Sequence, residues 1–357
     1  MADLVINPSD ARGIYTKAIV GTYAQNTAPL NFGRSFFAPV ESDTLEVSIE
    51  VIRDNEKVAV DVLRGTNGNR NTFSRSSEKI FIPPYFREYF DQTDLDLYDR
   101  VFVQGSTPAQ MIQFVQGVSM NYQKLQNKIE RAYEKMCWEV LETGVVTLVN
   151  DDNIDFKRKA GSLVNISGEA PWSTAASDIF GHLKAAGDFI RNTGKSLGNV
   201  LNAIMSGTVL NYLLASDQME KFGNFRRVDR ATLSTPAAQA NGGVLHGQIS
   251  AGDYLVNIWT YPEIYETSAG VQTPYFDATK VIVLPENPNF KLAFGAVPKL
   301  MNTGNPTFPQ AVQNVQGAYV LSDYVDARAH SHVFDIQSAG IPIPLAVDQI
   351  YTLKVLV

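Results

Sequence analysis

The most regular pattern in the chain is a run of apolar residues at spacings of three and four. The run comprises Met111, Val115, Val118, Tyr122, Leu125, Ile129, Ala132, Met136 and Val140. Such spacing places these residues on one side of an α-helix. The charged residues Lys124, Lys128, Arg131 and Glu134 fall off that side. We therefore predict one helix from 107 to 143, about 55 Å long, which would span an elongated molecule.

The ends of this helix also have suitable residues. Ser106 or Thr107 can cap its start, and Pro108 suits the first turn. Gly144 can end it.

A second pattern, with a period of two, precedes the helix. Apolar residues alternate with polar ones over 45–51 and again over 58–62, and 53–56 is a plausible turn. The segment Arg64–Lys79 is almost free of apolar residues and rich in turn formers. We predict a long β-hairpin with a polar tip. Because an isolated two-stranded hairpin is marginal in water, it needs another surface, and a second subunit is one candidate.

The remaining pattern mixes strands and helices and predicts an α+β chain. Residues 1–40 are polar and weakly periodic, as in an arm laid over another surface. Ser173 or Thr174 would cap a helix that Gly194 ends, and the other predicted helix is 208–222. We expect 231–252 to be a loop. The predicted strands are 145–149, 154–156, 197–205, 254–260, 280–284, 291–297, 333–336 and 350–355. The last two would return to the domain of the long helix.

Composition narrows the classes of function. The 357 residues predict about two domains, and a net charge of −7 argues against a generic nucleic-acid binder. The single Cys137 excludes an internal disulfide framework and a multi-cysteine zinc site. The first residues lack the apolar core of a secretory signal. The uncharged run 196–216 is too polar to cross a bilayer.

No motif assembles an active site. A nucleophile elbow is absent from the sequence, and Gly194-Lys195-Ser196 lacks the first glycine of a phosphate loop, since Phe189 stands there. We interpret this tripeptide as a helix end. Cys137 and Trp172 are expected to pack in the core, and His182 and His246 need only core or surface roles. We therefore predict no enzyme activity, no catalytic residue and no cofactor.

Two clusters remain as weak candidates for metal binding. His330 and His332 would share one face of a strand and could begin a zinc site, although a surface or interface pair is favoured. The carboxylates of Asp91, Asp94, Asp96 and Asp99 do not fit an EF-hand. A solvated acidic turn is the default for them, and weak cation binding between subunits is the alternative. No metal site is predicted.

The polar tip offers candidate contacts with a partner. Arg64, Arg70 and Arg75 decorate it, and Lys79 borders it. Guanidinium groups suit carboxylates on another molecule, so we select these four residues as inter-subunit contacts. A solvated loop kept soluble by its charge is the alternative.

Several segments, in order, resemble the major capsid proteins of tailed bacteriophages, and most nearly the lambda-type branch. The hairpin VAVDVLRGTNGNRNTFSRSSEKIFIPPYF resembles the extended loop of that family. SGEAPWSTAASDIFGHL and NVLNAIMSGTVLNYLLASDQMEKFGNFRR resemble its central segments. GDYLVNIWTYPEIYETSAGVQTPYFDATKVIVLP and FDIQSAGIPIPLAVDQIYTLKV resemble its later strands. The likeness covers most of 30–357.

The resemblance implies the Hong Kong 97 (Johnson) capsid fold, in four parts. These are an N-terminal arm (1–40), an extended loop (41–90), a peripheral domain (91–172 plus 325–357) with the spine helix 107–143, and an axial domain (173–324). Some relatives cross-link through a loop lysine. Lys57 and Lys79 border the hairpin here, but no motif identifies a matching Glu or Asn, so we do not expect cross-linking.

The resemblance further implies a subunit that forms pentamers and hexamers of an icosahedral phage head. Such a shell is assembled in the host bacterial cytoplasm with a scaffolding protein and a portal, and becomes part of the virion. A decoration protein is a further candidate partner. Packaged DNA would be contacted only non-specifically, and no membrane is involved. The alternatives are an encapsulin-like cellular compartment and an α+β enzyme.

Overall fold

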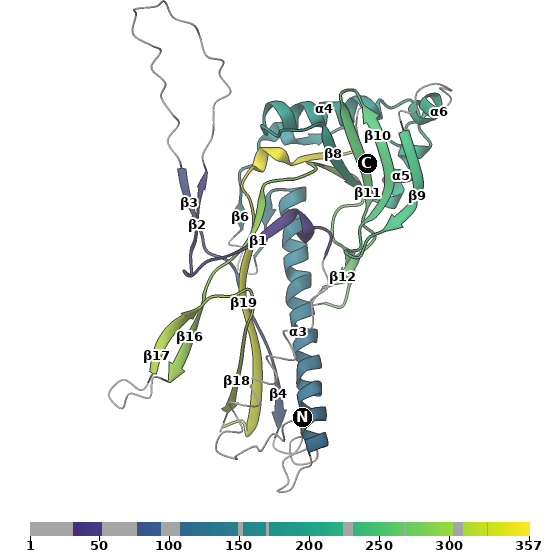
Figure 1. Ribbon diagram of the computed structural model, residues 1–357. Helices are drawn as coiled ribbons and strands as arrows, with labels where there is room; N and C mark the ends of the chain where they lie inside the picture. Colours follow the sequence, from purple (N-terminus) through teal and green to yellow (C-terminus); the bar gives the residue numbers. More distant parts are fainter. Residues whose placement is uncertain are drawn as a thin grey trace, which may run out of the picture.

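The computed structural model describes residues 31–51, 77–93, 108–148, 153–168, 171–223, 231–267, 269–302, 310–326 and 328–357. The long helix α3 (Pro108–Glu142) runs lengthwise through the molecule (Figure 1). Its 35 residues correspond to about 52 Å. The predicted helix 107–143 is thus confirmed to within one residue at each end, while its capping residues at 106 and 107 lie outside the described part.

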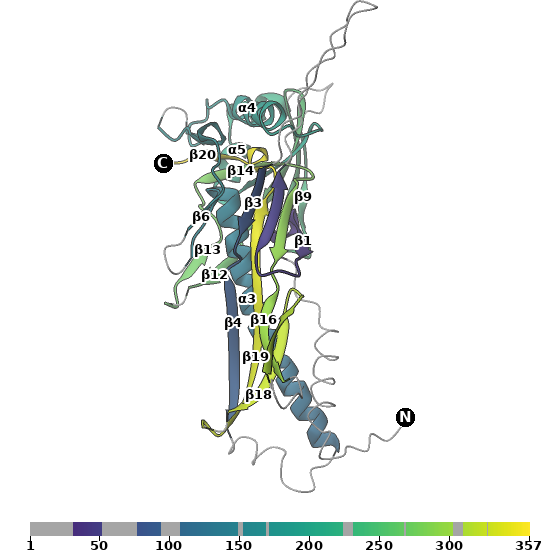
Figure 2. The ribbon, with the colours of Figure 1, turned by 90° about the vertical axis from the view of Figure 1, so that its left-hand side faces the viewer.

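A five-stranded sheet packs along α3 (Figures 1 and 2). Its path is β1 (Phe37–Glu41), β15 (Phe290–Phe294), β19 (Ser331–Pro344) and β18 (Val320–Asp326), and β4 (Tyr85–Thr93) also pairs with β19. β19 is long enough to pair with β15 near its end and with β4 and β18 over its first half. The sheet and the buried side of α3 share one apolar core.

A seven-stranded sheet lies beyond the C-terminal end of α3 (Figure 1). Its order is β7 (Leu163–Asn165), β20 (Tyr351–Lys354), β14 (Lys280–Pro285), β8 (Val200–Met205), β11 (Tyr254–Thr260), β10 (Val244–Ala251) and β9 (Ala231–Ala238). Helices α4 (Ile179–Asn192) and α5 (Gly207–Leu214) pack on it and form a second core, and α6 (Asp217–Gly223) follows α5.

Four two-stranded ribbons and three 3-10 turns complete the described part. The ribbons are β2 (Val47–Val51) with β3 (Ser77–Phe81), β5 (Val145–Val146) with β6 (Ile154–Asp155), β12 (Ile264–Glu266) with β13 (Gln272–Pro274), and β16 (Val297–Asn302) with β17 (Gln310–Val315). The turns are η1 (Arg34–Phe36), η2 (Ala160–Ser162) and η3 (Val347–Gln349).

The expectation of a loop over 231–252 was wrong. This region forms the antiparallel pair β9 and β10 at the edge of the seven-stranded sheet. The end of β9 is exposed, so its residues need not be apolar. A register shift between Leu245 and Gly247 also breaks the alternation that identifies a strand.

The helices after α3 differ from their predicted bounds. Asp178, rather than Ser173 or Thr174, caps α4, because its side chain accepts a hydrogen bond from the backbone nitrogen of Gly181. The single helix predicted over 208–222 is two helices separated at Ala215 and Ser216. The strand predicted from 197 begins at Val200.

The predicted hairpin is present at its base. β2 pairs with β3, so Val47 lies opposite Phe81 and Val51 opposite Ser77. Residues 77–79 therefore belong to a strand and not to the polar tip. The predicted turn at 53–56, the strand at 58–62 and the tip at 64–76 lie outside the described residues.

Strand membership differs from the predicted division at the C-terminus. β19 packs on α3 as expected, but β20, within the predicted 325–357 segment, joins the seven-stranded sheet. Conversely, β15 and most of β18 (320–324) fall within 173–324 yet belong to the five-stranded sheet. The naming of peripheral and axial domains stays a prediction.

Candidate functional site

The part of the described chain with the most buried charge is the contact between residues 32–34 and α3, which we call the arm clasp (Phe32, Gly33, Arg34, Glu130 and Glu134). The Glu134 carboxylate is fully buried. It accepts hydrogen bonds from the backbone nitrogens of Gly33 at 2.8 Å and Arg34 at 2.9 Å. These partners are about 100 positions away in sequence, so the carboxylate ties the end of the arm to the helix.

Neighbouring groups complete the hydrogen bonding of this carboxylate. The Trp138 indole nitrogen donates to Glu134 at 2.7 Å, and the Tyr261 hydroxyl is also hydrogen bonded to it. Burial raises the pKa of the Glu134 carboxyl above 4.5, and these hydrogen bonds oppose the rise. A buried carboxylate with several donors is stable without a counter-ion in direct contact.

The arm and the helix are also joined by an ion pair. The Arg34 guanidinium pairs with Glu130, which is buried and accepts a hydrogen bond from the Tyr319 hydroxyl. Gly33 is required by space, because a Cβ there would lie 2.7 Å from the Trp138 indole nitrogen. Residues of the arm, of α3 and of the segment just before β18 therefore hold the clasp together.

Aromatic rings surround the clasp. Trp138 stacks on Tyr261 and Phe276 with ring centroids 5.2 and 5.0 Å apart, and Phe32 of the arm lies 5.3 Å from Trp259. Trp259 and Tyr261 come from β11 and the residues after it. The rings therefore connect the helix, the arm and the seven-stranded sheet.

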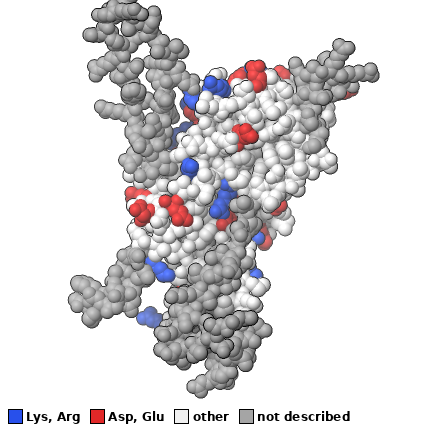
Figure 3. All heavy atoms as spheres, in the orientation of Figure 1, with Lys and Arg blue, Asp and Glu red and all other residues white. Residues whose placement is uncertain are grey.

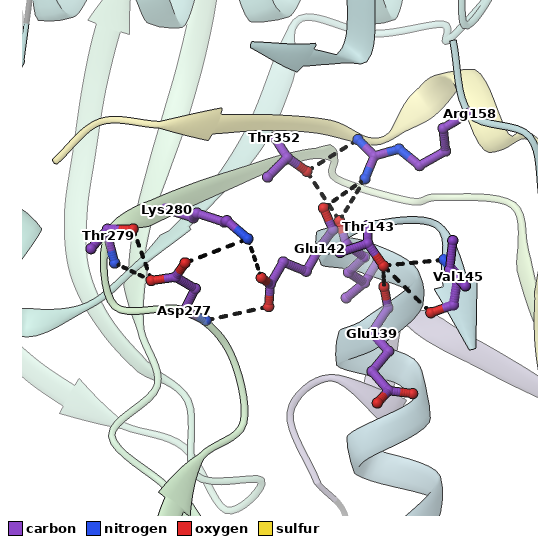
Figure 4. Close-up of polar contacts among 10 residues, drawn as sticks. Glu139, Glu142, Thr143, Val145, Arg158, Asp277, Thr279, Lys280 and Thr352 are labelled. Atoms are coloured by element: carbon purple, nitrogen blue, oxygen red, sulfur yellow. Dashed lines mark hydrogen bonds and ion pairs between the residues drawn. The ribbon is translucent and has the colours of Figure 1, made fainter. Parts of the chain in front are cut away.

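The C-terminal end of α3 forms a second polar junction, which we call the helix joint (Glu142, Arg158, Asp277 and Lys280; Figure 4). The guanidinium of Arg158 donates to the carbonyl oxygens of Leu141 and Glu142, each at 3.1 Å. It also donates to Ile350 and Thr352 beside and within β20. It therefore satisfies carbonyls that a helix end leaves unpaired and fixes them to the sheet.

The second half of the joint is an ion pair. Glu142 pairs with Lys280 at the start of β14, and it accepts a hydrogen bond from the backbone nitrogen of Asp277 at 3.3 Å (Figure 4). Burial lowers the pKa of Arg158 to about 10, so the group stays charged at neutral pH. Together these contacts orient α3 relative to the seven-stranded sheet.

The far face of the five-stranded sheet carries an ion pair and exposed aromatic rings. Arg87 of β4 contacts the buried Asp335 of β19, with nitrogen–oxygen distances of 2.9 Å. On the same strand Tyr85 and Tyr89 are 52% and 63% exposed. Arginine and tyrosine are enriched at protein interfaces, so this face can contact another molecule.

The predicted contact residues are only partly placed. Arg64, Arg70 and Arg75, and the candidate cross-linking residue Lys57, lie outside the described residues. Lys79 lies in β3, opposite Ile49. Figure 3 shows a mostly uncharged surface, with acidic side chains near the base of the β2–β3 ribbon. The exposed acidic residues of that region are Glu41, Asp43 and Glu46.

The histidines do not form the predicted strand pair. His332 lies in β19 and its Nε2 is 3.0 Å from an Asp323 oxygen, whereas His330 precedes the strand with a φ of 49°. Of the acidic cluster, Asp91 is an exposed residue of β4, and Asp94, Asp96 and Asp99 lie outside the described residues. Within the described part, no group of three or more metal-ligating side chains comes together.

The remaining residues considered in the sequence have the packing or helix-end positions that were predicted for them. Cys137 is fully buried in α3, and burial raises the pKa of its thiol. Trp172 is buried, and its indole nitrogen lies 3.2 Å from Nδ1 of His182. Gly194 follows the end of α4, and its backbone nitrogen donates to the Phe189 carbonyl. His246 is hydrogen bonded to Thr260 at 2.8 Å.

The sequence pattern predicted neither the arm clasp nor the helix joint. Glu134 lies off the apolar stripe, as predicted, yet it is buried because the arm and Tyr261 cover it. The only signal in the sequence was the i, i+4 spacing of Glu130 and Glu134, which also occurs on many exposed helices. Nothing in the local pattern around Arg34 or Arg158 distinguishes them from surface residues.

Comparisons with known proteins give one family and one fold. A family model described as phage major capsid protein E matches residues 23–355. No curated protein matches significantly. Among the described helices, none is long and apolar enough for a membrane span.

Two solved structures have a similar fold along nearly the whole chain. One is described as a prophage capsid protein of Escherichia coli CFT073, with 16% identity, a TM-score of 0.59 and 99% of each chain covered. The other is a phage-related protein of Bordetella bronchiseptica RB50, with 11% identity, a TM-score of 0.51 and 96% of each chain covered.

Proposed function

Since the chain belongs to the phage major capsid protein E family, we propose that its pentamers and hexamers build the icosahedral head around packaged double-stranded DNA. The fold is the Hong Kong 97-like capsid fold, and the role of the family is structural. The observation that carries the proposal is the family match over 23–355. This range includes the arm residues from 23, the long helix and both sheets.

The shape of the subunit supports assembly in which a projecting ribbon contacts a neighbouring subunit. The β2–β3 ribbon extends away from both sheets (Figure 1), and a two-stranded ribbon alone is marginal in water. Ile80 and Ile82 at its base are 60% and 69% exposed. In our proposal the ribbon and its polar tip lie on a neighbouring subunit, where Arg64, Arg70, Arg75 and Lys79 contact carboxylates.

The proposed partners follow from the same role. A separate scaffolding protein and a portal would act during assembly in the host bacterial cytoplasm, and a decoration protein could bind the finished head. Packaged DNA would meet a chain of net charge −7, which favours loose, non-specific contact. No observation on the described residues favours the encapsulin-like or enzymatic alternative.

The test is electron microscopy with sedimentation of the purified chain, with and without its neighbouring scaffold gene product. Closed particles, pentamers or hexamers are expected. A stable monomer under all conditions would contradict the proposal.

The role of the tip is tested by deleting 64–76, which leaves β3 intact. The deletion should leave a folded subunit that does not close into shells. The triple variant Arg64→Gln, Arg70→Gln and Arg75→Gln should weaken assembly. The matched control Lys157→Gln, Lys184→Gln and Lys221→Gln removes the same charge elsewhere. Equal assembly of both triple variants would exclude a specific role for the tip arginines.

A further inference from the structure

A cleft of about 620 Å³ lies between α3 and the β12–β13 ribbon, beside β4. Its apolar lining includes Phe86, Ile129, Ala132, Ile264 and Tyr265. The cationic side chains around it are Lys128, Arg131 and Lys135. A cleft with an apolar lining and cations suits a segment that presents apolar and acidic side chains together.

The cations belong to a longer stripe on the exposed side of α3. Lys124, Lys128, Arg131 and Lys135 follow spacings of four, three and four, which keeps them on one side of the helix. Glu130 and Glu134 of the same segment point into the arm clasp and are buried. The exposed side is therefore cationic in a chain whose net charge is −7.

Two carboxylates, Glu88 and Glu266, line the cleft against three cations, so they neutralise this stripe only in part. Lys128 lies 2.7 Å from Glu88, and Lys135 lies 3.1 Å from Glu139. Both pairs are solvent-exposed, and such pairs contribute at most about 1 kcal/mol, so a competing carboxylate can replace them. Arg131 is exposed at the centre of the stripe.

One segment of the chain matches this chemistry closely. Residues 91–99 contain four aspartates, Asp91, Asp94, Asp96 and Asp99, and no basic residue. Leu95, Leu97 and Tyr98 alternate with them. We propose that the cleft binds residues 94–99 of a neighbouring copy of this chain, with aspartates against the cations and leucines against the apolar lining. This inference rests on the proposed self-assembly.

The length of the chain favours a neighbouring copy over the same subunit. Thr93 lies five residues along β4 from Glu88, about 17 Å, and Pro108 lies twenty residues along α3 from Lys128, about 30 Å. The fourteen residues between Thr93 and Pro108 span at most about 50 Å. They would have to be almost fully extended to reach their own cleft and return, whereas a neighbour's segment has no such constraint.

Duplex DNA is the less favoured occupant. A DNA duplex would present charged phosphates to the exposed cations of this cleft. Its backbone has no group that would fill the apolar part of the cleft. A peptide segment can fill both parts of the cleft. DNA binding is therefore an outcome that would overturn the proposal.

The test uses two variants of the full chain with one added cysteine each, Arg131→Cys and Asp96→Cys. Cys137 is fully buried, so it contributes little background. The variants are assembled together and oxidised with copper–phenanthroline, and non-reducing gels are then run. A dimer band at least about fivefold stronger than that of Lys221→Cys mixed with Asp96→Cys is expected, because a formed contact raises the effective thiol concentration. Equal bands would overturn the proposal.

A charge-reversal series checks the contact without cysteines. Arg131→Asp should slow shell assembly, and Asp96→Arg in the same chain should restore it. Absence of rescue would overturn the pairing. In a second measurement, unassembled Arg131→Cys subunits are alkylated with and without duplex DNA. Slower alkylation of the added cysteine in the presence of DNA would also overturn the proposal. If wild-type shells form but no cross-link does, only this inference fails. If wild-type shells never form, the proposed function fails first.

Discussion

The two halves of α3 share one apolar spacing but have different surroundings. In the C-terminal half, Tyr133, Glu134, Cys137, Trp138 and Leu141 are all fully buried. In the N-terminal half, Ile112 and Met120 are 58% and 60% exposed. The C-terminal half contacts the five-stranded sheet, the arm and Tyr261 after β11. In the N-terminal half, Tyr122 packs on Phe90 and Phe334 of the five-stranded sheet.

The difference shows that one helix serves two purposes. Its C-terminal half is the fixed part, because the arm clasp and the helix joint attach it to both sheets. Its N-terminal half leaves the apolar side chains of Ile112 and Met120 on the surface, where a neighbouring subunit can cover them. We therefore expect substitutions of the exposed apolar residues in the first half to affect assembly, and substitutions of the buried residues in the second half to affect folding.

The largest effect is expected for Trp138→Ala. The side chain is fully buried, stacks on Tyr261 and Phe276, and donates to Glu134. Its removal leaves a cavity and takes one hydrogen-bond donor from the Glu134 carboxylate, so the free energy of unfolding should fall by about 3–5 kcal/mol. Urea unfolding of unassembled subunits measures this. A loss below about 1 kcal/mol would mean that this half of the helix is not the fixed one.

A smaller effect is expected for Glu134→Gln. The amide group of glutamine would face donors, so the free energy of unfolding should fall by about 1–3 kcal/mol. Glu139→Gln on the same helix is the matched control, because that side chain is 21% exposed, and its change should stay within about 1 kcal/mol. Equal losses would show that burial of the clasp carboxylate is unimportant.

The pH dependence of this variant sharpens the test. Because the folded-state pKa of Glu134 lies above its ordinary value of 4.5, the folded chain holds this proton more tightly than the unfolded chain. The stability contributed by the group therefore falls as pH rises from about 4.5 through the folded-state pKa. The cost of Glu134→Gln should thus be larger at pH 4.5 than at pH 8. The opposite trend would indicate a lowered pKa.

The smallest effect on folding is expected for Met120→Ser. The side chain is 60% exposed, so the free energy of unfolding should change by no more than about 0.5 kcal/mol. Shell assembly, measured by light scattering, should nevertheless slow, since an apolar contact with a neighbour is lost. Unchanged assembly would show that the exposed apolar residues of the first half are not used.

Elements with a clear period were predictable from the sequence. The spacing of Val115 to Val140 predicted α3, and the alternation over 45–51 predicted β2, since each pattern matches only one regular structure. The pair β9 and β10 was missed because an edge strand with exposed polar residues and a register shift has no clean alternation. The division between the sheets was also not predictable, because the chain leaves the five-stranded sheet after β19, and β20 then pairs with β14 in the seven-stranded sheet.

The candidate site was far less predictable than the fold. Glu134 and Arg34 are a hundred positions apart, and only packing brings the Arg34 backbone nitrogen within 2.9 Å of the carboxylate. Arg158 joins the end of α3 to β20 in the same way, across more than 190 positions. Contacts of this kind have no local period, so no window along the chain reveals them.

The sequence by itself therefore determined the long helix, the hairpin base, most of the central strands and, through their order, the family. Periodicity decides these features because backbone geometry fixes which residues share a face. Only the tertiary structure decided which charges are buried, which half of α3 is fixed and where the cationic cleft lies. Burial depends on what covers a residue, and for Glu134 and Arg131 the covering groups come from distant parts of the chain or, in our proposal, from a neighbouring subunit.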